Sequence, residues 1–251
     1  KTIFEKSNFN KVVNLAAQAG VQYSLVNPHE YIDSNISGFM NVLECCREFN
    51  IEGLIYASSS SVYGGNEKTP FAETDNVDNP ISIYAASKKS NELMANVYHK
   101  LYDLNATGLR FFTVYGPYGR PDMSLFLFVK AILKKQKINV FNYGKMKRDF
   151  TYIDDIVHGI LGVLKSKKKF SHKIYNLGNS HPEVLLEFVE LIEKNLNLKA
   201  KKTLLPIQPG DVSETFADIS ESKKDFRFLP KTKVSKGIPK FITWYKDYYK
   251  L

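Results

Sequence analysis

The 251-residue sequence predicts an α/β protein, in which a parallel sheet covered by helices on both faces is followed by a smaller mixed α/β region. Two observations predict this class. The first half alternates short apolar strand signals with helix signals, and the second half loses that regularity. We therefore expect one unit over residues 1–116 and a second mainly over residues 117–251, with a segment near 150–178 packing back onto the first.

The first half contains three strand signals separated by helix and loop signals. The expected elements are a buried strand at 11–17, a helix at 31–49, a strand at 53–59, a polar loop at 64–80, a helix from about Ser82 to Tyr102, and a strand at 106–116. Apolar strands joined through helices pair in parallel. Ligands of such sheets bind at the carboxyl ends of the strands.

The second half carries four helix signals and two short strand signals. The expected helices run from Ser124 to about Lys134 and over 152–166, 182–196 and 238–251, and the strands over 138–142 and 173–178. Pro182 is expected near the start of its helix, where a proline needs no hydrogen-bonded N–H.

Composition and charge exclude several classes of protein. Hydrophobic residues make up 43% of the chain, which is typical of a globular protein. The net charge of +9 suits either nucleic acid or an anionic small substrate, and no nucleic-acid motif is present. Cys45 and Cys46 are adjacent, so they cannot join distant segments and they lack metal-ligand spacing. We expect a cytoplasmic protein with no metal, no nucleic-acid partner and no membrane segment.

The stretch ISIYAASKKSNEL holds the first candidate chemistry. Tyr84 and Lys88 have the spacing Y-x-x-x-K at a predicted helix start, where residues i and i+4 share a face. A lysine beside a tyrosine favours the phenolate, which can remove a proton from a substrate hydroxyl. The same pattern recurs at Tyr143 and Lys147, but Gly144 makes a helix doubtful there. An ordinary helix start remains the alternative for the first pair.

Other motifs support the chemical interpretation. Four serines, Ser58 to Ser61, follow the strand at 53–59, at the edge where a parallel sheet binds its ligands. Seven segments occur once each along the chain, in this order: VVNLAAQAG, ASSSSVYG, YAASK, LRFFTVYGP, GRPDM, VFNYGKMKRDFTYIDDI and QPGDV. Together they resemble the extended short-chain dehydrogenase/reductase family, and most closely its UDP-glucuronate 4-epimerase branch. The resemblance covers nearly the whole chain and implies a Rossmann-like doubly wound sheet with a C-terminal substrate domain.

The resemblance implies catalytic and cofactor roles. Tyr84 would be the acid/base, Lys88 its partner and Ser59 the catalytic hydroxyl, with NAD as cofactor. Related dehydratases carry Asp-Glu after that serine, and related decarboxylases carry a glutamate at the second position. Because Ser60 and Ser61 cannot act as strong acids or bases, epimerisation is favoured. The implied cofactor contacts are Leu15, Ala16, Ala17, Ser34, Tyr84, Lys88 and Phe112.

The implied substrate is a UDP-sugar, with UDP-glucuronate favoured. Ser60, Ser61 and Thr113 would hold the uronate carboxylate as neutral donors. The implied nucleotide contacts are Arg148 for the diphosphate, with Arg120 as a second candidate, Asp211 for the uridine ribose, Gln208 nearby, and Phe141 against the uracil. For Arg148 the alternative is a surface ion pair with Asp149 or Asp154, and for Asp211 it is a turn residue after Gly210.

The front of the chain departs from the family pattern. None of the 14 glycines completes the G-x-x-G-x-x-G loop that holds the cofactor diphosphate. We therefore expect the chain to be part of a longer protein. The alternatives are an epimerase of another UDP-hexose, of the UDP-glucose or UDP-N-acetylglucosamine type, and a non-catalytic protein that binds nucleotide sugars. A homodimer is expected, with the helix around NELMANVYHKLY as a candidate interface.

Overall fold

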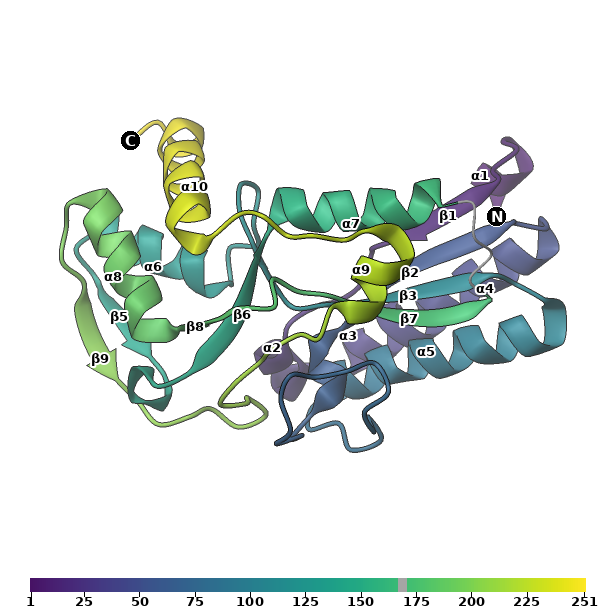
Figure 1. Ribbon diagram of the computed structural model, residues 1–251, viewed down its shortest axis with the longest axis horizontal. Coiled ribbons are helices and arrows are strands. Elements are labelled where there is room, and N and C mark those ends of the chain that lie inside the picture. The colour runs from purple at the N-terminus through teal and green to yellow at the C-terminus, as the bar shows by residue number, and fades with distance from the viewer. Residues whose placement is uncertain (167–170) are drawn as a thin grey trace.

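The computed structural model describes residues 1–166 and 171–251, and Figure 1 shows two groups of elements side by side. The N-terminal group is built on a parallel sheet with the strand order β1-β2-β3-β7. Its strands are β1 (Lys11–Asn14), β2 (Gly53–Ser59), β3 (Ala106–Phe111) and β7 (His172–Leu177). Because all four strands run in the same direction, their carboxyl ends meet at one edge of the sheet.

Helices cover both faces of this sheet (Figure 1). Successive side chains of a strand point to opposite faces, so the apolar strands need a helical layer on each side. Leu54 and Tyr56 of β2 pack with α4 (Gly38–Glu48) and α5 (Ile83–Tyr102) on one face, while Ile55 packs with α7 (Ile153–Lys165) on the other. The helices of this group are α1 (Thr2–Glu5), α2 (Val21–Val26), α3 (His29–Tyr31), the π-helix η1 (Ile32–Ser37), α4 (Gly38–Glu48), the 3₁₀-helix η2 (Ser60–Tyr63), α5 (Ile83–Tyr102), α7 (Ile153–Lys165) and α9 (Ser220–Phe226).

The second group contains a sheet of order β4-β6-β8 and a parallel pair, β5 and β9. Its elements are β4 (Thr113–Tyr115), α6 (Ser124–Leu133), β5 (Lys137–Val140), the 3₁₀-helix η3 (Asn142–Gly144), β6 (Lys147–Tyr152), β8 (Pro182–Val184), α8 (Leu185–Leu196), β9 (Lys201–Leu204) and α10 (Val234–Tyr249). Its apolar core includes Phe150 and Phe188, whose rings stack at 4.0 Å between centroids. Since α7 follows β6 directly, the two groups are joined at Tyr152 and Ile153.

Helix α5 begins and ends where its local sequence dictates. Ser82 is extended, and its Oγ accepts a hydrogen bond from the Ala85 N–H at 3.1 Å, which caps the first turn. Asp103 ends the helix in the left-handed conformation, with φ of 53°. Both β2 and α5 match their predicted ranges, and α5 presents Tyr84 in its first turn.

The strand expected at 11–17 differs from the prediction. It ends at Asn14, and it is not buried, because Val13 is 39% and Leu15 48% exposed. The reason is its place in the sheet: among the described residues, β1 is an edge strand that pairs with β2 alone. A run of apolar residues indicates a strand but not how many neighbours that strand has.

Two further predicted elements are divided in the structure. The strand expected at 106–116 breaks at Phe112, where the chain leaves β3 and enters β4 in the other sheet. The helix expected at 182–196 begins at Leu185, because residues 182–184 form β8 against β6. Pro182 lies in an edge strand, where its missing N–H costs little. Elements that the sequence did not predict are α1, α2, α3, η2, η3, β6, β9 and α9.

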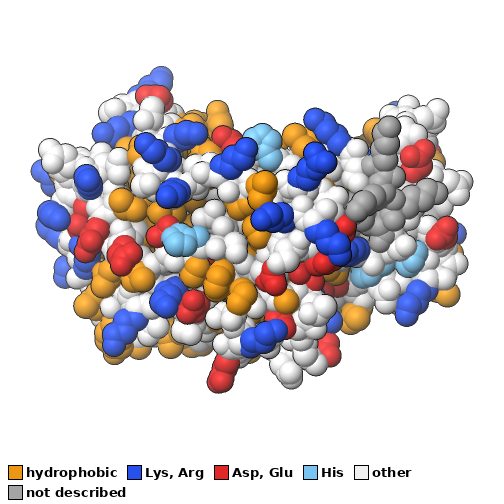
Figure 2. Space-filling view, viewed as in Figure 1, with side chains coloured by type: hydrophobic (Ala, Val, Ile, Leu, Met, Phe, Trp, Pro, Cys, Tyr) orange, Lys and Arg blue, Asp and Glu red, His pale blue; other side chains and the backbone are white. Residues whose placement is uncertain are grey.

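Positive and negative side chains are mixed on one face of the molecule. On the face shown in Figure 2, lysine and arginine side chains are interspersed with aspartate and glutamate. None of the helices within residues 1–166 and 171–251 is long and apolar enough to cross a bilayer.

Candidate active site

Strand β2 ends in a cluster of hydroxyls at the carboxyl edge of the sheet. Ser59 caps η2, since its Oγ accepts a hydrogen bond from the Ser61 N–H at 3.1 Å. Ser58 and Ser59 are buried, whereas Ser60 and Ser61 are half-buried. The cap turns the chain just beyond the strand, so Ser60 and Ser61 lie at the edge where parallel sheets bind ligands.

Tyr84 lies next to this hydroxyl cluster. Its phenol lies within reach of the Ser59 hydroxyl, and its ring meets the Tyr31 ring edge-on with centroids 6.0 Å apart. Burial raises the pKa of the Tyr84 phenol, while the Ser59 hydrogen bond and the positive charge of Arg120 lower it. A half-buried phenol held by a serine hydroxyl can exchange a proton with a bound alcohol.

Lys88 lies one turn after Tyr84 and points toward β2. Its ammonium donates a hydrogen bond to the Ala57 carbonyl at 2.8 Å, and the residue is 3% exposed. Burial without a carboxylate partner lowers the pKa of Lys88 to about 8. The structure therefore brings Ser59, Tyr84 and Lys88 together at the end of β2.

The second Y-x-x-x-K pair has a different geometry. Tyr143 lies in η3 with φ of 51°, is 53% exposed, and Lys147 begins β6. The two side chains do not share a helix face, which confirms the doubt that Gly144 raised.

We expect the buried ammonium of Lys88 to make stability depend on pH. Its pKa is about 8 in the folded protein against 10.5 for an unperturbed lysine, so between these values the folded state binds fewer protons than the unfolded state. The free energy of unfolding contributed by Lys88 therefore rises with pH across this window. At about 1.4 kcal/mol per pKa unit, the wild type should gain on the order of 3 kcal/mol relative to Lys88→Met. Denaturant unfolding of both proteins across the window measures the gain, and equal pH slopes would contradict it.

A buried asparagine that the sequence analysis missed holds the loop after β1. Asn35, in η1, accepts a hydrogen bond from the Gln18 N–H at 2.8 Å and donates to the Gln18 carbonyl at 2.9 Å. It also donates to the Ser87 hydroxyl of α5 at 2.9 Å. Asn35 thus ties this loop to the helix that carries Tyr84 and Lys88. The sequence offered one signal, a polar residue among the apolar positions of a helix.

The predicted cofactor contacts follow the strand ends. Leu15 is exposed, Ala16 and Ala17 belong to the extended segment after β1, and Ser34 is exposed beside Asn35. Phe112 directly follows β3 and is buried, with its ring 6.3 Å from the ring of Tyr63.

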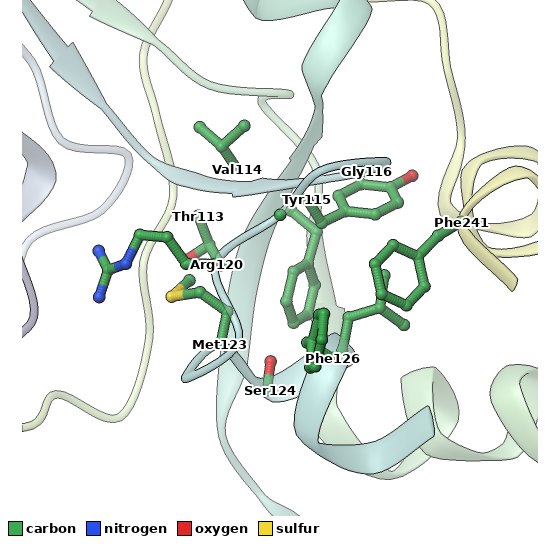
Figure 3. Close-up of a pocket in the computed structure, with 12 residues that line it drawn as sticks. Thr113, Val114, Tyr115, Gly116, Arg120, Met123, Ser124, Phe126 and Phe241 are labelled. Carbon is green, nitrogen blue, oxygen red and sulfur yellow. The ribbon is translucent and has the colours of Figure 1, made fainter. Parts of the chain in front are cut away.

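Arg120 reaches from the turn after β4 toward the loop after β1. Its guanidinium lies 3.1 Å from the place that a Cβ on Gly20 would take, and it is ion-paired with Asp122. Figure 3 shows it pointing away from the aromatic rings of a small cavity that Thr113 and Met123 also line. That cavity, about 20 Å³, has room for one water molecule and none for a sugar. Arg120 also lies close enough to Tyr84 for its positive charge to act on the phenol.

Arg148 and Asp211 form an ion pair. The Arg148 guanidinium donates to Asp211 Oδ1 at 2.7 Å and to the Val212 carbonyl at 2.6 Å. The alternative interpretation, an ion pair with Asp149 or Asp154, is therefore wrong. The side chain of Arg148 turns instead toward the segment that carries Asp211. Burial lowers the pKa of Arg148, and the charge of Asp211 raises it.

The turn that carries Asp211 packs against the start of α5. The Asp211 N–H donates to the Gln208 carbonyl at 3.2 Å, and Gly210 adopts φ of +74°. A Cβ on Gly210 would lie 3.3 Å from Val21 and 3.5 Å from the Ile81 carbonyl. Residues from the two halves of the chain therefore meet close to Tyr84.

Thr113 and Phe141 occupy less central positions. Thr113 is half-buried at the start of β4, shortly after Phe111, which is the register partner of Ser59. Phe141 is half-buried against the core of the second group. Thr113 thus lies near the hydroxyl cluster, whereas Phe141 is attached to the C-terminal group.

Asp149 is a second residue that the sequence analysis missed. It is fully buried and accepts backbone hydrogen bonds from Asn179 at 2.6 Å, Ser180 at 3.0 Å and Ala217 at 3.0 Å. Burial raises its pKa to about 6, although these bonds lower it. Asp149, the residue after Arg148, therefore joins β6 to two distant segments, one at Asn179 and Ser180 and one at Ala217.

Comparisons with known proteins identify relatives of this chain. The sequence model of the NAD dependent epimerase/dehydratase family matches residues 1–178. Protein CapI of Staphylococcus aureus is 56% identical over 255 residues, which cover 95% of this chain and 76% of that protein. UDP-glucuronate 4-epimerase 2 of Arabidopsis thaliana is 46% identical over 266 residues, which cover all of this chain and 61% of the plant enzyme.

A solved structure has the same fold. The UDP-glucuronic acid 4-epimerase from Bacillus cereus, in complex with UDP-glucuronic acid and NAD, superposes with a TM-score of 0.93 at 32% identity. The match covers 99% of this chain and 78% of that one.

Proposed function

The chain belongs to the NAD dependent epimerase/dehydratase family, and from that premise we propose that it interconverts UDP-glucuronate and UDP-galacturonate by epimerisation at C4. The observation that carries the proposal is the placement of Ser59, Tyr84 and Lys88 at the carboxyl edge of the sheet.

Lys88 fits the nicotinamide end of NAD. Its buried ammonium has three N–H donors, and the Ala57 carbonyl is its one acceptor within the described residues. A pair of ribose hydroxyls would supply the missing acceptors. NAD, when bound, would supply the acceptor and later the donor of the C4 hydride.

Tyr84 would move the proton. Its phenolate would take the proton of the C4 hydroxyl, and the resulting phenol would return that proton after the 4-keto sugar has turned over, with the Ser59 hydroxyl beside the same oxygen. Burial raises the pKa of the phenol, and the nearby Ser59 hydroxyl and the charge of Arg120 oppose that rise, so both favour the phenolate that the reaction needs.

Ser60 and Ser61 favour epimerisation over other outcomes. Neither side chain can act as an acid or a base at neutral pH, so no group there promotes loss of water. The 4-keto uronate is a β-keto acid, which loses carbon dioxide when its carboxylate can align. We propose that Ser60, Ser61 and Thr113 hold that carboxylate in an unreactive orientation.

The nucleotide would lie along the Arg148–Asp211 pair. The Arg148 guanidinium suits the diphosphate, and Asp211 suits the ribose because Oδ1 is used by Arg148 and by the Val212 N–H. Oδ2 of Asp211 is therefore available to accept from ribose hydroxyls. Gln208 and Phe141 would contact the uridine, which assigns nucleotide binding mainly to residues 117–251.

Incubation with UDP-glucuronate and NAD tests the function. We expect UDP-galacturonate as the product, resolved from the substrate by chromatography, with no net change in NAD. UDP-glucose and UDP-N-acetylglucosamine serve as competing substrates. Turnover of either one in place of the uronate would assign a different sugar, and no turnover of any of them would reject the epimerase function.

The hydroxyl cluster gives a prediction about product distribution. Ser61→Ala and Thr113→Ala should each lower the rate of uronate epimerisation about tenfold and increase release of carbon dioxide, because a lost hydrogen bond to a charged group costs about 1.5–3 kcal/mol. Product analysis by mass spectrometry measures both effects. Ser213→Ala, on the nucleotide side, is the control. Unchanged rates and products in both variants would contradict the role.

We propose that the protein forms a homodimer through α4 and α5. The outer face of α5 exposes Leu93 by 53%, Val97 by 48% and Leu101 by 66%, spaced four residues apart on one stripe. An apolar stripe of this kind is typical of a contact surface. Met40 of α4, 38% exposed, is attached to α5 by a hydrogen bond from Tyr98 to its sulfur.

Charge on that stripe should separate the subunits. Leu93→Glu with Val97→Glu is expected to halve the mass measured by sedimentation, because two carboxylates would be buried in the interface. Leu127→Glu, which alters an exposed leucine of α6, should leave the mass unchanged. A wild-type protein with the mass of one chain would contradict the dimer.

We propose the reducing cytoplasm as the compartment. Cys45 and Cys46 are both free thiols. Burial raises the pKa of Cys46 to about 12, which keeps its thiol protonated and unreactive. Structural disulfides are rare in that compartment, which agrees with free cysteines.

A further inference from the structure

A row of polar side chains crosses the sheet one residue before its carboxyl edge. Ser58 of β2 is the register partner of Arg110 in β3, which is the partner of Asn176 in β7. All three are at least 97% buried. Partners in register present their side chains on the same face, so the three form a continuous row.

Glu92 of α5 joins this row to the helix that carries Tyr84. Its carboxylate accepts from Ser58 Oγ at 2.6 Å and from Arg110 through Nε and a second guanidinium nitrogen, both at 2.8 Å. Glu92 lies one turn after Lys88, which bonds the carbonyl of Ala57. Two successive residues of β2, Ala57 and Ser58, are therefore held by two successive turns of α5.

The same row holds the other end of η2. The Arg110 guanidinium lies 4.8 Å from the centre of the Tyr63 ring, and the Tyr63 hydroxyl donates to Asn176 Oδ1 at 2.7 Å. Tyr63 is the last residue of η2, and Ser58 directly precedes its cap, Ser59. The turn that carries the hydroxyl cluster is thus attached to the row at both ends.

Stability alone does not account for the Glu92–Arg110 pair. Taking two charges out of water costs several kcal/mol for each ion, and well-packed apolar residues often replace such pairs without loss of stability. One Arg110 nitrogen, Nη1, is buried with no hydrogen-bond partner in the described residues. An arginine that leaves a donor unpaired is better explained by what its position achieves.

We propose that Glu92 and Arg110 are positioning residues, which hold Ser59, Ser60 and Ser61 in register with Tyr84 and Lys88. The expected change in kcat rests on the proposed function. The expected change in the structure of η2 does not depend on it. Movement of η2 would leave the nucleotide contacts of Arg148 and Asp211 in place. Loss of the pair should therefore lower kcat and leave UDP affinity unchanged.

The test replaces the pair with apolar residues of similar size. Glu92→Met with Arg110→Met is expected to lower kcat about 10²-fold, the cost of a misplacement of about 1 Å. UDP affinity, measured by calorimetry, should stay within twofold of wild type. The matched control is Glu193→Met with Lys202→Met, which removes a partly buried ion pair between α8 and β9 and should leave kcat unchanged.

Amide hydrogen exchange supplies a readout that does not depend on turnover. Exchange of the peptide covering residues 59–64 should become at least tenfold faster in the double variant, whereas peptides from α10 should not change. Tyr63→Phe, a smaller change, should accelerate the same peptide if the double variant fails to fold. A wild-type protein without epimerase activity would reject the proposed function and leave this readout intact. Unchanged exchange of residues 59–64 in a folded variant would overturn the positioning role.

Discussion

Tyr84→Phe is expected to lower kcat for UDP-glucuronate by about 10²–10⁴-fold, the contribution of a positioned acid or base. The substitution removes only the phenol oxygen, which is the group that Ser59 holds and Arg120 influences. The ring, its edge-on contact with Tyr31 and the helix cap at Ser82 all remain. The loss should therefore appear in kcat, while UDP affinity and the temperature of unfolding stay close to wild type.

The chain contains its own control for this experiment. Tyr143→Phe alters the tyrosine of the second Y-x-x-x-K pair, which is 53% exposed on η3. Steady-state rates of the two variants, compared with wild type, separate a catalytic phenol from a surface one. Equal rates for Tyr84→Phe and wild type would remove Tyr84 from the mechanism.

The largest expected change in stability is that of Asp149→Ala. The substitution leaves three N–H groups without an acceptor: the buried one of Ala217 and the partly buried ones of Asn179 and Ser180. At about 1–3 kcal/mol for each unsatisfied group, the free energy of unfolding should fall by roughly 3–5 kcal/mol. Denaturant unfolding measures the loss.

Asp154→Ala is the matched control, since Asp154 is an exposed aspartate in the first turn of α7. Its loss should cost about 0.3–1 kcal/mol, the usual worth of an acid at a helix N-terminus. A loss for Asp149→Ala no larger than this would contradict its role as a joint between segments. Because Asp149 is next to Arg148, the variant should also weaken UDP binding.

The stability that Asp149 contributes should depend on pH and should be larger in acid. Burial raises the pKa of Asp149 to about 6, above the value of 3.8 for a free aspartate. In this window the folded state binds more protons, so the stability that Asp149 contributes falls as pH rises from 3.8 to 6. The difference in unfolding free energy between wild type and Asp149→Ala should therefore be larger at the acid end.

The local sequence was sufficient for the elements that carry the catalytic residues. Strand β2 and helix α5 follow from an apolar run, a polar loop and the cap at Ser82, all of which act within a few residues. The spacing of Tyr84 and Lys88 puts both on one helix face for the same reason. The fold class likewise followed from alternation along the chain, as the match to the epimerase family confirms.

Contacts between distant segments were beyond such reasoning. Asn35 bonds Gln18 and Ser87, and Asp149 bonds two distant segments, but nothing near either residue in sequence identifies those partners. The exposure of β1, the break at Phe112 and the pairing of β8 depend on which strands become neighbours. Periodicity shows that a segment is apolar on one side, and only the folded chain shows what lies against it.

Some charged residues could be identified from the sequence, and others only from the folded structure. Arg148 and Asp211 could be named from their motifs, but their ion pair joins positions 63 residues apart and needed the folded chain to bring them together. Glu92 and Arg110 carry no local signal at all, because a charged residue in a helix or strand normally faces water. Local sequence determines which helix face Tyr84 occupies. The packing of that helix on β2 and β3 determines which groups surround it, since desolvation and hydrogen bonding arise only between segments that folding brings together.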